Sequence, residues 1–153
     1  MVQLKPLGVL LSTLFLIVPF TSEKSIDVHY CDKIADYVVK VRGVDISPFP
    51  VPRGKKTTFT IAASTDEAVS GGKLEIEVFY FGIHVHNENH DLCKEISCPV
   101  SVGDFVLSHS LKLSRFTPPG SYMLKMTMED ENNKRLTCIT FDFTIGFVAQ
   151  ESL

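Results

Sequence analysis

One stretch of the chain alternates apolar and charged side chains almost without a break: Lys73-Leu74-Glu75-Ile76-Glu77-Val78-Phe79-Tyr80-Phe81. Successive side chains of a β-strand point to opposite faces of a sheet. Alternation over this length therefore predicts a strand with one face buried and the other face in water. The Ser-Gly-Gly sequence directly before it, residues 70–72, indicates a turn.

The same alternation recurs in four further segments, which are residues 57–63, 105–113, 122–129 and 139–145. Turn-forming residues separate the segments at 53–54, 70–72, 117–120 and 130–133. No segment shows a helical period. Short alternating strands at this spacing, with the last two joined as a hairpin, predict an all-β fold of two packed sheets.

A proline-rich segment interrupts the strands at residues 47–52, Ser-Pro-Phe-Pro-Val-Pro. Proline has no backbone N–H group to donate to a sheet ladder, so this segment cannot be a central strand. We expect it to run along a sheet edge or to cross from one sheet to the other.

Residues 1–22 have the composition of a secretory signal peptide. Lys5 is followed by an uncharged apolar run, residues 7–20, and the chain turns polar at residues 21–24. The alternative is a membrane anchor, but about fourteen apolar residues fall short of the roughly 20 that a spanning helix needs. We expect cleavage within about five residues of position 22.

Beyond this leader, roughly 130 residues remain, which suits one domain with one core. The whole chain has a formal net charge of −3. A mildly acidic domain lacks the basic face of a nucleic-acid-binding protein, so we expect no nucleic-acid partner. No apolar run after the leader is long enough to span a bilayer.

The chain has four cysteines, Cys31, Cys93, Cys98 and Cys138. In the oxidising compartment that a signal peptide implies, an even number predicts two disulfides, and four cysteines allow three pairings. The residues by themselves do not choose among these pairings. A zinc site with four thiolates is the alternative, but no C-x-x-C pair is present and we expect none.

Several motifs together resemble the ML lipid-recognition domain family. They are Cys31, residues 47–50 followed by Gly54, residues 93–100, residues 119–122 and residues 136–138. The resemblance covers about Val28 to Phe147, and we place the domain at residues 26–148. It is strongest to the plant phosphatidylglycerol/phosphatidylinositol transfer proteins, which are related to the Niemann–Pick sterol carrier.

The resemblance implies an immunoglobulin-like two-sheet β-sandwich whose sheets splay apart around an apolar cavity. It also implies the pairings Cys31 with Cys138 and Cys93 with Cys98. The chain departs from the sterol carrier at Phe49, where the carrier has a cysteine, and at residues 83–87, where the carrier has a proline-rich aromatic stretch. These departures weaken any transfer of sterol specificity.

A lipid-binding and lipid-transfer protein is therefore the function that the resemblance implies, without catalysis or cofactor, for a phospholipid (phosphatidylinositol or phosphatidylglycerol) or a sterol. Ordinary core packing is the alternative role for the inward side chains. We expect Tyr80 and Tyr122 to direct their hydroxyls to polar partners. The residues expected to line the cavity are Phe59, Ile61, Ile76, Val78, Tyr80, Phe105, Leu107, Tyr122, Leu124, Met126, Phe141 and Phe143.

A lipid phosphate would require cations at the cavity mouth. Lys112 and Arg115 end a strand whose apolar face is expected inside, and they are our candidates for head-group contact. Further basic residues occur at 53–56 and 134–135. Solvated turn charge is the alternative role for all of them.

Histidines gather at His84, His86 and His90, followed by Asp91, and the spacing places His84 and His86 on one strand face. A solvated loop, a pH-sensitive loop and a metal site are three interpretations of this cluster. We expect the solvated loop and no bound metal.

Enzymatic activity finds little support in the sequence. There is no G-x-S-x-G motif, and Ser108 and His109, as strand neighbours, are expected to point to opposite faces. The main alternative function is a lipid-sensing immunoglobulin-like adaptor or co-receptor that presents its ligand to a membrane receptor, with Phe79, Phe81 or Phe147 as contact patch. For either function we expect a monomer that contacts membranes transiently, either secreted to the extracellular space or delivered to a vacuole or lysosome.

Overall fold

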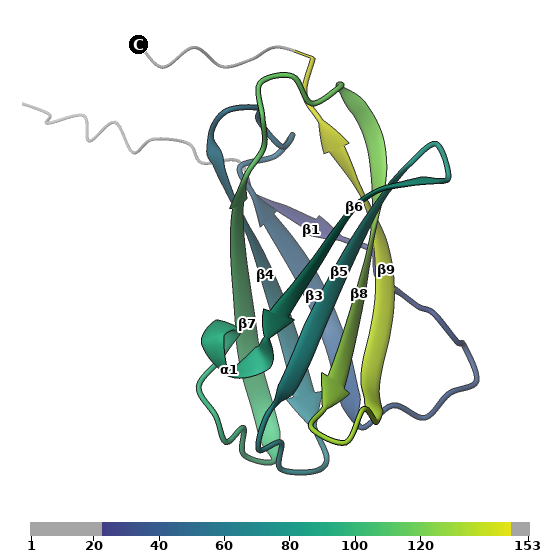
Figure 1. Ribbon diagram of the computed structural model, residues 1–153, viewed down its shortest axis with the longest axis vertical. Helices are drawn as coiled ribbons and strands as arrows, with labels where there is room; N and C mark the ends of the chain where they lie inside the picture. The colour runs from purple at the N-terminus through teal and green to yellow at the C-terminus, as the bar shows by residue number, and fades with distance from the viewer. Residues whose placement is uncertain (1–22, 148–153) are drawn as a thin grey trace, which may run out of the picture.

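The computed structural model describes residues 23–147, in which nine strands form two antiparallel sheets (Figure 1). The expected signal peptide, residues 1–22, lies outside the described residues. The four-stranded sheet contains, in spatial order, β1 (Lys24–Ile26), β3 (Val39–Ser47), β4 (Lys56–Thr65) and β7 (Gly103–Lys112). The five-stranded sheet contains β2 (His29–Tyr30), β9 (Arg135–Ile145), β8 (Gly120–Asp130), β5 (Gly72–Tyr80) and β6 (Ile83–Asp91).

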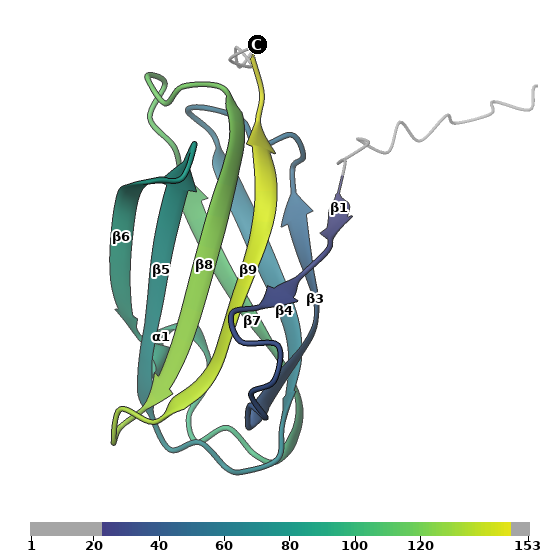
Figure 2. The same cartoon turned by 90° about the vertical axis from the view of Figure 1, so that its right-hand side faces the viewer.

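The sheets pack face to face, as the side view in Figure 2 shows, and the all-β sandwich predicted from the sequence is confirmed. All five segments with alternating side chains are strands, namely β4, β5, β7, β8 and β9, and the last two form a hairpin. A short helix, α1 (Leu92–Glu95), follows β6. Within residues 23–147 no helix is long and apolar enough to cross a membrane.

Sequence alternation did not reveal β3 and β6. In β3 the pairing with β4 shifts between Val41 and Gly43, so the inward side chains do not keep a period of two along the strand. The second half of β6 is polar on both faces, from His86 to Asp91. A strand without an apolar face gives no periodic signal, although it pairs with β5 along its length.

The core is built from the inward faces of both sheets. Phe59 on β4 contacts Phe141 and Phe143 on β9, with ring centroids 6.2 and 5.8 Å apart. Each large apolar side chain that is fully buried stabilises the fold by about 1.5–3 kcal/mol. These aromatic contacts therefore fix the two sheets against each other in the middle of the sandwich.

The proline-rich segment crosses between the sheets, which is one of the two courses expected from its sequence. It leaves the end of β3 and reaches β9 of the other sheet, where the Val51 amide donates to the Thr144 carbonyl at 2.8 Å. The Gly146 amide donates in turn to the Val51 carbonyl at 3.0 Å. The prolines occupy positions of the crossing that need no ladder donor.

The two disulfides have the pairing that the resemblance implies. Cys31, just after β2, is bonded to Cys138 on β9, at a sequence separation of 107 and a Cα–Cα distance of 5.4 Å. Cys93 in α1 is bonded to Cys98, with a Cα–Cα distance of 5.3 Å. The first bridge ties the N-terminal segment to the five-stranded sheet, and the second closes the loop after α1.

One side of the sandwich is bordered by the edge strands β6 and β7, which belong to different sheets. Figure 1 shows them close together beside α1 and spread apart toward the opposite end. Because edge strands of two different sheets share no ladder of hydrogen bonds, the sheets can separate here without breaking backbone pairing.

Candidate functional site

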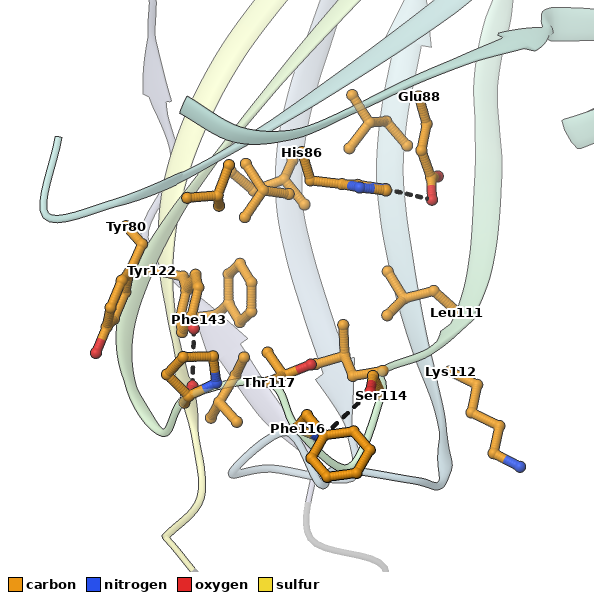
Figure 3. A pocket seen from close by; sticks show the side chains of 17 residues that line it. Tyr80, His86, Glu88, Leu111, Lys112, Ser114, Phe116, Thr117, Tyr122 and Phe143 are labelled. Carbon is orange, nitrogen blue, oxygen red and sulfur yellow. Dashed lines mark hydrogen bonds and ion pairs between the residues drawn. The ribbon is translucent and has the colours of Figure 1, made fainter. Parts of the chain in front are cut away.

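A cavity of about 530 Å³ opens between β6 and β7 at the end away from α1 (Figure 3). Ligand pockets in proteins typically have volumes of about 300–1,000 Å³. The five-stranded sheet contributes Ile76, Val78, Tyr80, Val85, His86, Glu88, Tyr122, Leu124, Phe143 and Ile145. The other wall is the end of β7 with the loop after it, and it contributes Leu111, Lys112, Leu113, Ser114, Phe116, Thr117 and Pro118.

The inner wall of the cavity follows directly from strand register. Val78 on β5 pairs with Leu124 on β8, and Tyr80 pairs with Tyr122, so alternate residues of both strands face the same side. The rings of Tyr80 and Tyr122 stack with centroids 4.4 Å apart, and Phe143 lies 5.7 Å beyond Tyr122. This wall is a continuous apolar and aromatic surface.

The polar atoms of the two tyrosines are directed away from this surface. The Tyr80 hydroxyl donates to the Pro119 carbonyl at 3.1 Å, and the Tyr122 hydroxyl donates to the Pro118 carbonyl at 2.7 Å. Both hydroxyls therefore find polar partners, as the sequence predicts. Burial raises the pKa of the Tyr122 hydroxyl, and the neighbouring Tyr80 adds to the rise. The two hydrogen bonds anchor the loop at the mouth.

The residues expected to line the cavity fall into two groups in the structure. The group at the cavity consists of Ile76, Val78, Tyr80, Tyr122, Leu124 and Phe143. The other group packs in the core outside the cavity and consists of Phe59, Ile61, Phe105, Leu107, Met126 and Phe141. Both groups point inward, but the cavity occupies one end of the interface between the sheets. Alternation identifies the inward face and gives no information about where the sheets separate.

The lining residues expected from the sequence include none from the wall formed by the end of β7 and the loop after it. Leu111 and Leu113 continue the alternation of β7 on its inner face, so the sequence carried a signal for both. Phe116 belongs to the loop after β7 and is not part of an alternating segment, so no sequence pattern marks it as a lining residue. Its side chain is 93 % exposed, and Figure 3 shows its ring at the mouth.

Of the two candidate head-group residues, Lys112 lines the cavity and Arg115 does not. Lys112 lines the rim, where its side chain extends beside the mouth (Figure 3). Arg115 lies outside the lining, close to Gly54 in the turn before β4. Its carbonyl accepts a hydrogen bond from Arg53 at 3.5 Å. Lys112 is therefore the basic side chain of this pair that directly borders the cavity.

The expectation that His84 and His86 share one strand face is wrong. His84 pairs with Phe79 and His86 pairs with Val78, so β6 has an extra residue, Val85, between them. This β-bulge turns the two imidazoles to opposite faces of the sheet. His84 lies on the outer face, 3.7 Å from the carboxylate of Glu77.

After the bulge, alternate residues of β6 point inward and form a polar cluster below the cavity. The Nε2 atom of His86 lies 2.8 Å from Oε1 of Glu88, and Nε2 of His90 lies 2.9 Å from Oε2 of the same carboxylate. His109 reaches this cluster from β7. Burial acts to raise the pKa of Glu88, but hydrogen bonds from His86 and His90 and the charge of His109 outweigh it and lower this pKa.

Ser108 and His109 are neighbours on β7. Ser108 is exposed and His109 is buried, so their side chains point to opposite faces, as predicted.

Three phenylalanines were considered as a contact patch for a membrane receptor. Phe81 and Phe147 are 82 % and 76 % exposed. Phe79 packs against the ring of His84, with centroids 5.3 Å apart.

Comparisons with known proteins agree with this architecture. The family model of the ML domain matches residues 25–145. A protein of Dictyostelium discoideum, named provisionally as a phosphatidylglycerol/phosphatidylinositol transfer protein, is 33 % identical over 117 residues, which are 74 % of this chain and 81 % of that protein. The phosphatidylglycerol/phosphatidylinositol transfer protein of Neurospora crassa is 28 % identical over 127 residues, covering 77 % of this chain and 72 % of the relative.

Two solved structures share the fold at low sequence identity. A Niemann–Pick type C2 protein from the Japanese carpenter ant aligns with a TM-score of 0.55 and 13 % identity, covering 82 % of this chain and 92 % of that one. Chicken MD-1, solved in complex with lipid IVa, aligns with the same TM-score and identity, covering 84 % of this chain and 99 % of that one.

Proposed function

The chain belongs to the ML domain family, and from this membership and the geometry of its cavity we propose that it binds a phospholipid between its sheets and transfers it between membranes. The observation that carries the proposal is the cavity of about 530 Å³ with apolar and aromatic walls, open at one end. Relatives named as phosphatidylglycerol/phosphatidylinositol transfer proteins favour a glycerophospholipid over a sterol.

The physical basis of binding is burial of the acyl chain. Each methylene transferred from water to the cavity contributes about 0.8 kcal/mol. The head group stays at the rim, where Lys112 and the loop after β7 border the opening. No bond is made or broken in this cycle, so the proposed activity is binding and release without catalysis.

We propose that the protein works in the secretory pathway or outside the cell. Both disulfides support this location, because such bonds form and persist in oxidising compartments. The leader expected at residues 1–22 would direct the chain there.

The proposal is tested by native mass spectrometry of the purified secreted protein, followed by a transfer assay between donor and acceptor vesicles. We expect one co-purifying phospholipid per chain and transfer of many lipids per protein molecule. Stoichiometric binding without repeated transfer would favour the adaptor or co-receptor instead. Purification without any lipid, combined with no uptake from vesicles, would contradict both functions.

Charge at the rim should set the preference for anionic lipids. We expect Lys112→Glu to weaken transfer of phosphatidylglycerol by about three- to tenfold, because the reversal replaces attraction of the phosphate by repulsion at an exposed site. Transfer of neutral phosphatidylcholine should change less than twofold by the same estimate. The measurement is the initial transfer rate for each lipid in vesicles of otherwise identical composition.

Lys134→Glu is the matched control for this variant. Lys134 lies in the β8–β9 turn at the opposite end of the sandwich, and its reversal changes the net charge by the same amount. It should leave the lipid preference as it is in the unmodified protein. If both variants slow phosphatidylglycerol transfer equally, net charge governs the preference and the role of Lys112 is refuted.

Exposed apolar residues at the mouth should mediate contact with the bilayer. Phe116 lies there, and Phe81 and Ile83 are exposed at the turn that follows Tyr80. We expect Phe116→Asp to slow transfer by about ten- to hundredfold, because burying a phenylalanine in an apolar environment contributes about 1.5–3 kcal/mol. Affinity for a short-chain lipid in solution should fall much less.

Val102→Asp provides the control, since Val102 is 63 % exposed and precedes β7 at the end away from the cavity. This variant should transfer lipid at the unmodified rate. Equal slowing by both substitutions would show that a general loss of surface hydrophobicity, not contact at the mouth, limits transfer.

A further inference from the structure

Below the cavity, three potential metal ligands converge from the two edge strands. Glu88 and His90 lie two residues apart on the inner face of β6, and His109 reaches them from β7. One ligand atom from each side chain lies within 4.8 Å of the others. These three residues form no continuous sequence motif, because β6 and β7 belong to different sheets.

The distances within the cluster suit a tetrahedral ion. Nε2 of His109 lies 3.4 Å from Oε2 of Glu88, and Nε2 of His90 lies 2.9 Å from the same oxygen. Zinc bonds of about 2.1 Å at the tetrahedral angle place neighbouring ligand atoms about 3.4 Å apart. Small side-chain rotations would bring all three atoms to bonding distance of one ion.

His109 supplies independent support for a ligand at this position. His109 is buried, with 8 % of its surface exposed. Its Nε2 atom makes no hydrogen bond, although the Glu88 carboxylate lies 3.4 Å away. A buried nitrogen that makes no hydrogen bond is costly, and it often indicates an additional ion, water or ligand. This atom faces Glu88 and His90.

The opposite nitrogens of both imidazoles face a second carboxylate. Nδ1 of His109 lies 3.3 Å from Oε2 of Glu95, and Nδ1 of His90 lies 3.6 Å from Oε1 of the same side chain. Glu95 is held in α1, between β6 and β7. Histidine ligands of metals commonly donate their other N–H group to a carboxylate, which fixes the ring orientation. On the other side of the cluster, Nε2 of His86 lies 2.8 Å from Oε1 of Glu88 and holds this carboxylate in position.

We propose that Glu88, His90 and His109 bind a zinc ion, with Glu95 orienting the two imidazoles. Two imidazoles and one carboxylate form a ligand set that suits Zn²⁺ over Mg²⁺ or Ca²⁺, which prefer oxygen ligands. Water would complete the coordination. The ion would join β6 to β7 next to the cavity, at the edge where the sheets share no hydrogen-bonded ladder. From the sequence we expected no bound metal, because nothing in it indicates that the histidines converge.

The test is isothermal titration of Zn²⁺ into the purified secreted protein after treatment with a chelator. We expect one ion per chain and a higher melting temperature when zinc is present. His90→Gln and His109→Gln should each weaken zinc binding by more than about a hundredfold, because they remove a ligand. Glu95→Gln should weaken it by about ten- to hundredfold, as expected for a partner outside the coordination sphere. Mg²⁺ at the same concentration should not raise the melting temperature.

His84→Gln is the matched control, because His84 lies on the same strand and faces the opposite side of the sheet. It should bind zinc with the affinity of the unmodified protein. If His109→Gln fails to fold by circular dichroism, the partly exposed His90 carries the test alone. Absence of zinc binding to the unmodified protein, or equal weakening by His84→Gln and His90→Gln, would overturn the proposal.

Discussion

Filling the cavity from both walls should remove most lipid binding and leave the protein folded. Val78 on β5 and Leu111 on β7 line the cavity from opposite sheets, and both are only partly buried. Tryptophan at both positions would occupy space that an acyl chain otherwise takes. Exclusion of about four methylenes at 0.8 kcal/mol each corresponds to an affinity loss of about a hundredfold or more. The measurement is displacement of a fluorescent phospholipid by titration.

A control substitution separates loss of space from a general effect of tryptophan. Val106 lies on β7 with 59 % of its surface exposed, outside the cavity lining. Val106→Trp should bind the fluorescent phospholipid with unchanged affinity. Overpacking of a filled core costs about 1–3 kcal/mol, so a stable double variant would itself indicate that the cavity has room. Unchanged lipid affinity in a folded double variant would exclude this cavity as the binding site.

Removing the long-range disulfide should destabilise the protein more than any single surface change. The Cys31–Cys138 bridge closes a loop with a sequence separation of 107 residues. On the chain-entropy model a loop of about 100 residues is worth about 4.7 kcal/mol, and native disulfides of small secreted domains typically contribute about 2–5 kcal/mol. We expect the Cys31→Ala, Cys138→Ala variant to lose a free energy of unfolding in this range, measured by urea denaturation of lipid-free protein.

The second disulfide provides the comparison for this measurement. Cys93 and Cys98 are five positions apart, and on the same model so short a loop is worth about 2 kcal/mol. Alanine at both positions should therefore cost less than alanine at Cys31 and Cys138. Alanine is used in place of serine because Cys138 is fully buried, and a serine there would bury an unpaired hydroxyl. Equal losses for the two double variants would show that loop length does not determine the contribution of these bridges.

The strands that could be predicted from sequence are those with one buried and one solvated face. β5 shows this most clearly, because Leu74 and Ile76 alternate with Lys73, Glu75 and Glu77. β6 could not be predicted in the same way, because its inner face carries His86, Glu88 and His90. These polar side chains are directed inward because β7 contributes His109 opposite them, and α1 contributes Glu95.

For the candidate site, too, the sequence predicted one property and not another. Alternation identified Val78, Tyr80 and Tyr122 as inward residues, and they line the cavity. It identified Phe59 and Phe141 equally well, yet their rings meet across the middle of the sandwich. The difference between the two groups is the local distance between the sheets, which no single strand encodes.

The sequence alone determined the properties that depend on neighbouring residues: the alternation of strands, the turns between them and the exclusion of the proline-rich segment from a central strand. Tertiary structure decided where the sheets separate, which aromatic rings border the cavity, and that His109 meets Glu88 and His90. The physical reason is the distance along the chain over which each property is set. Side-chain direction along a strand follows from backbone geometry within a few residues, whereas the spacing of two sheets follows from the combined volume of side chains that are distant in sequence.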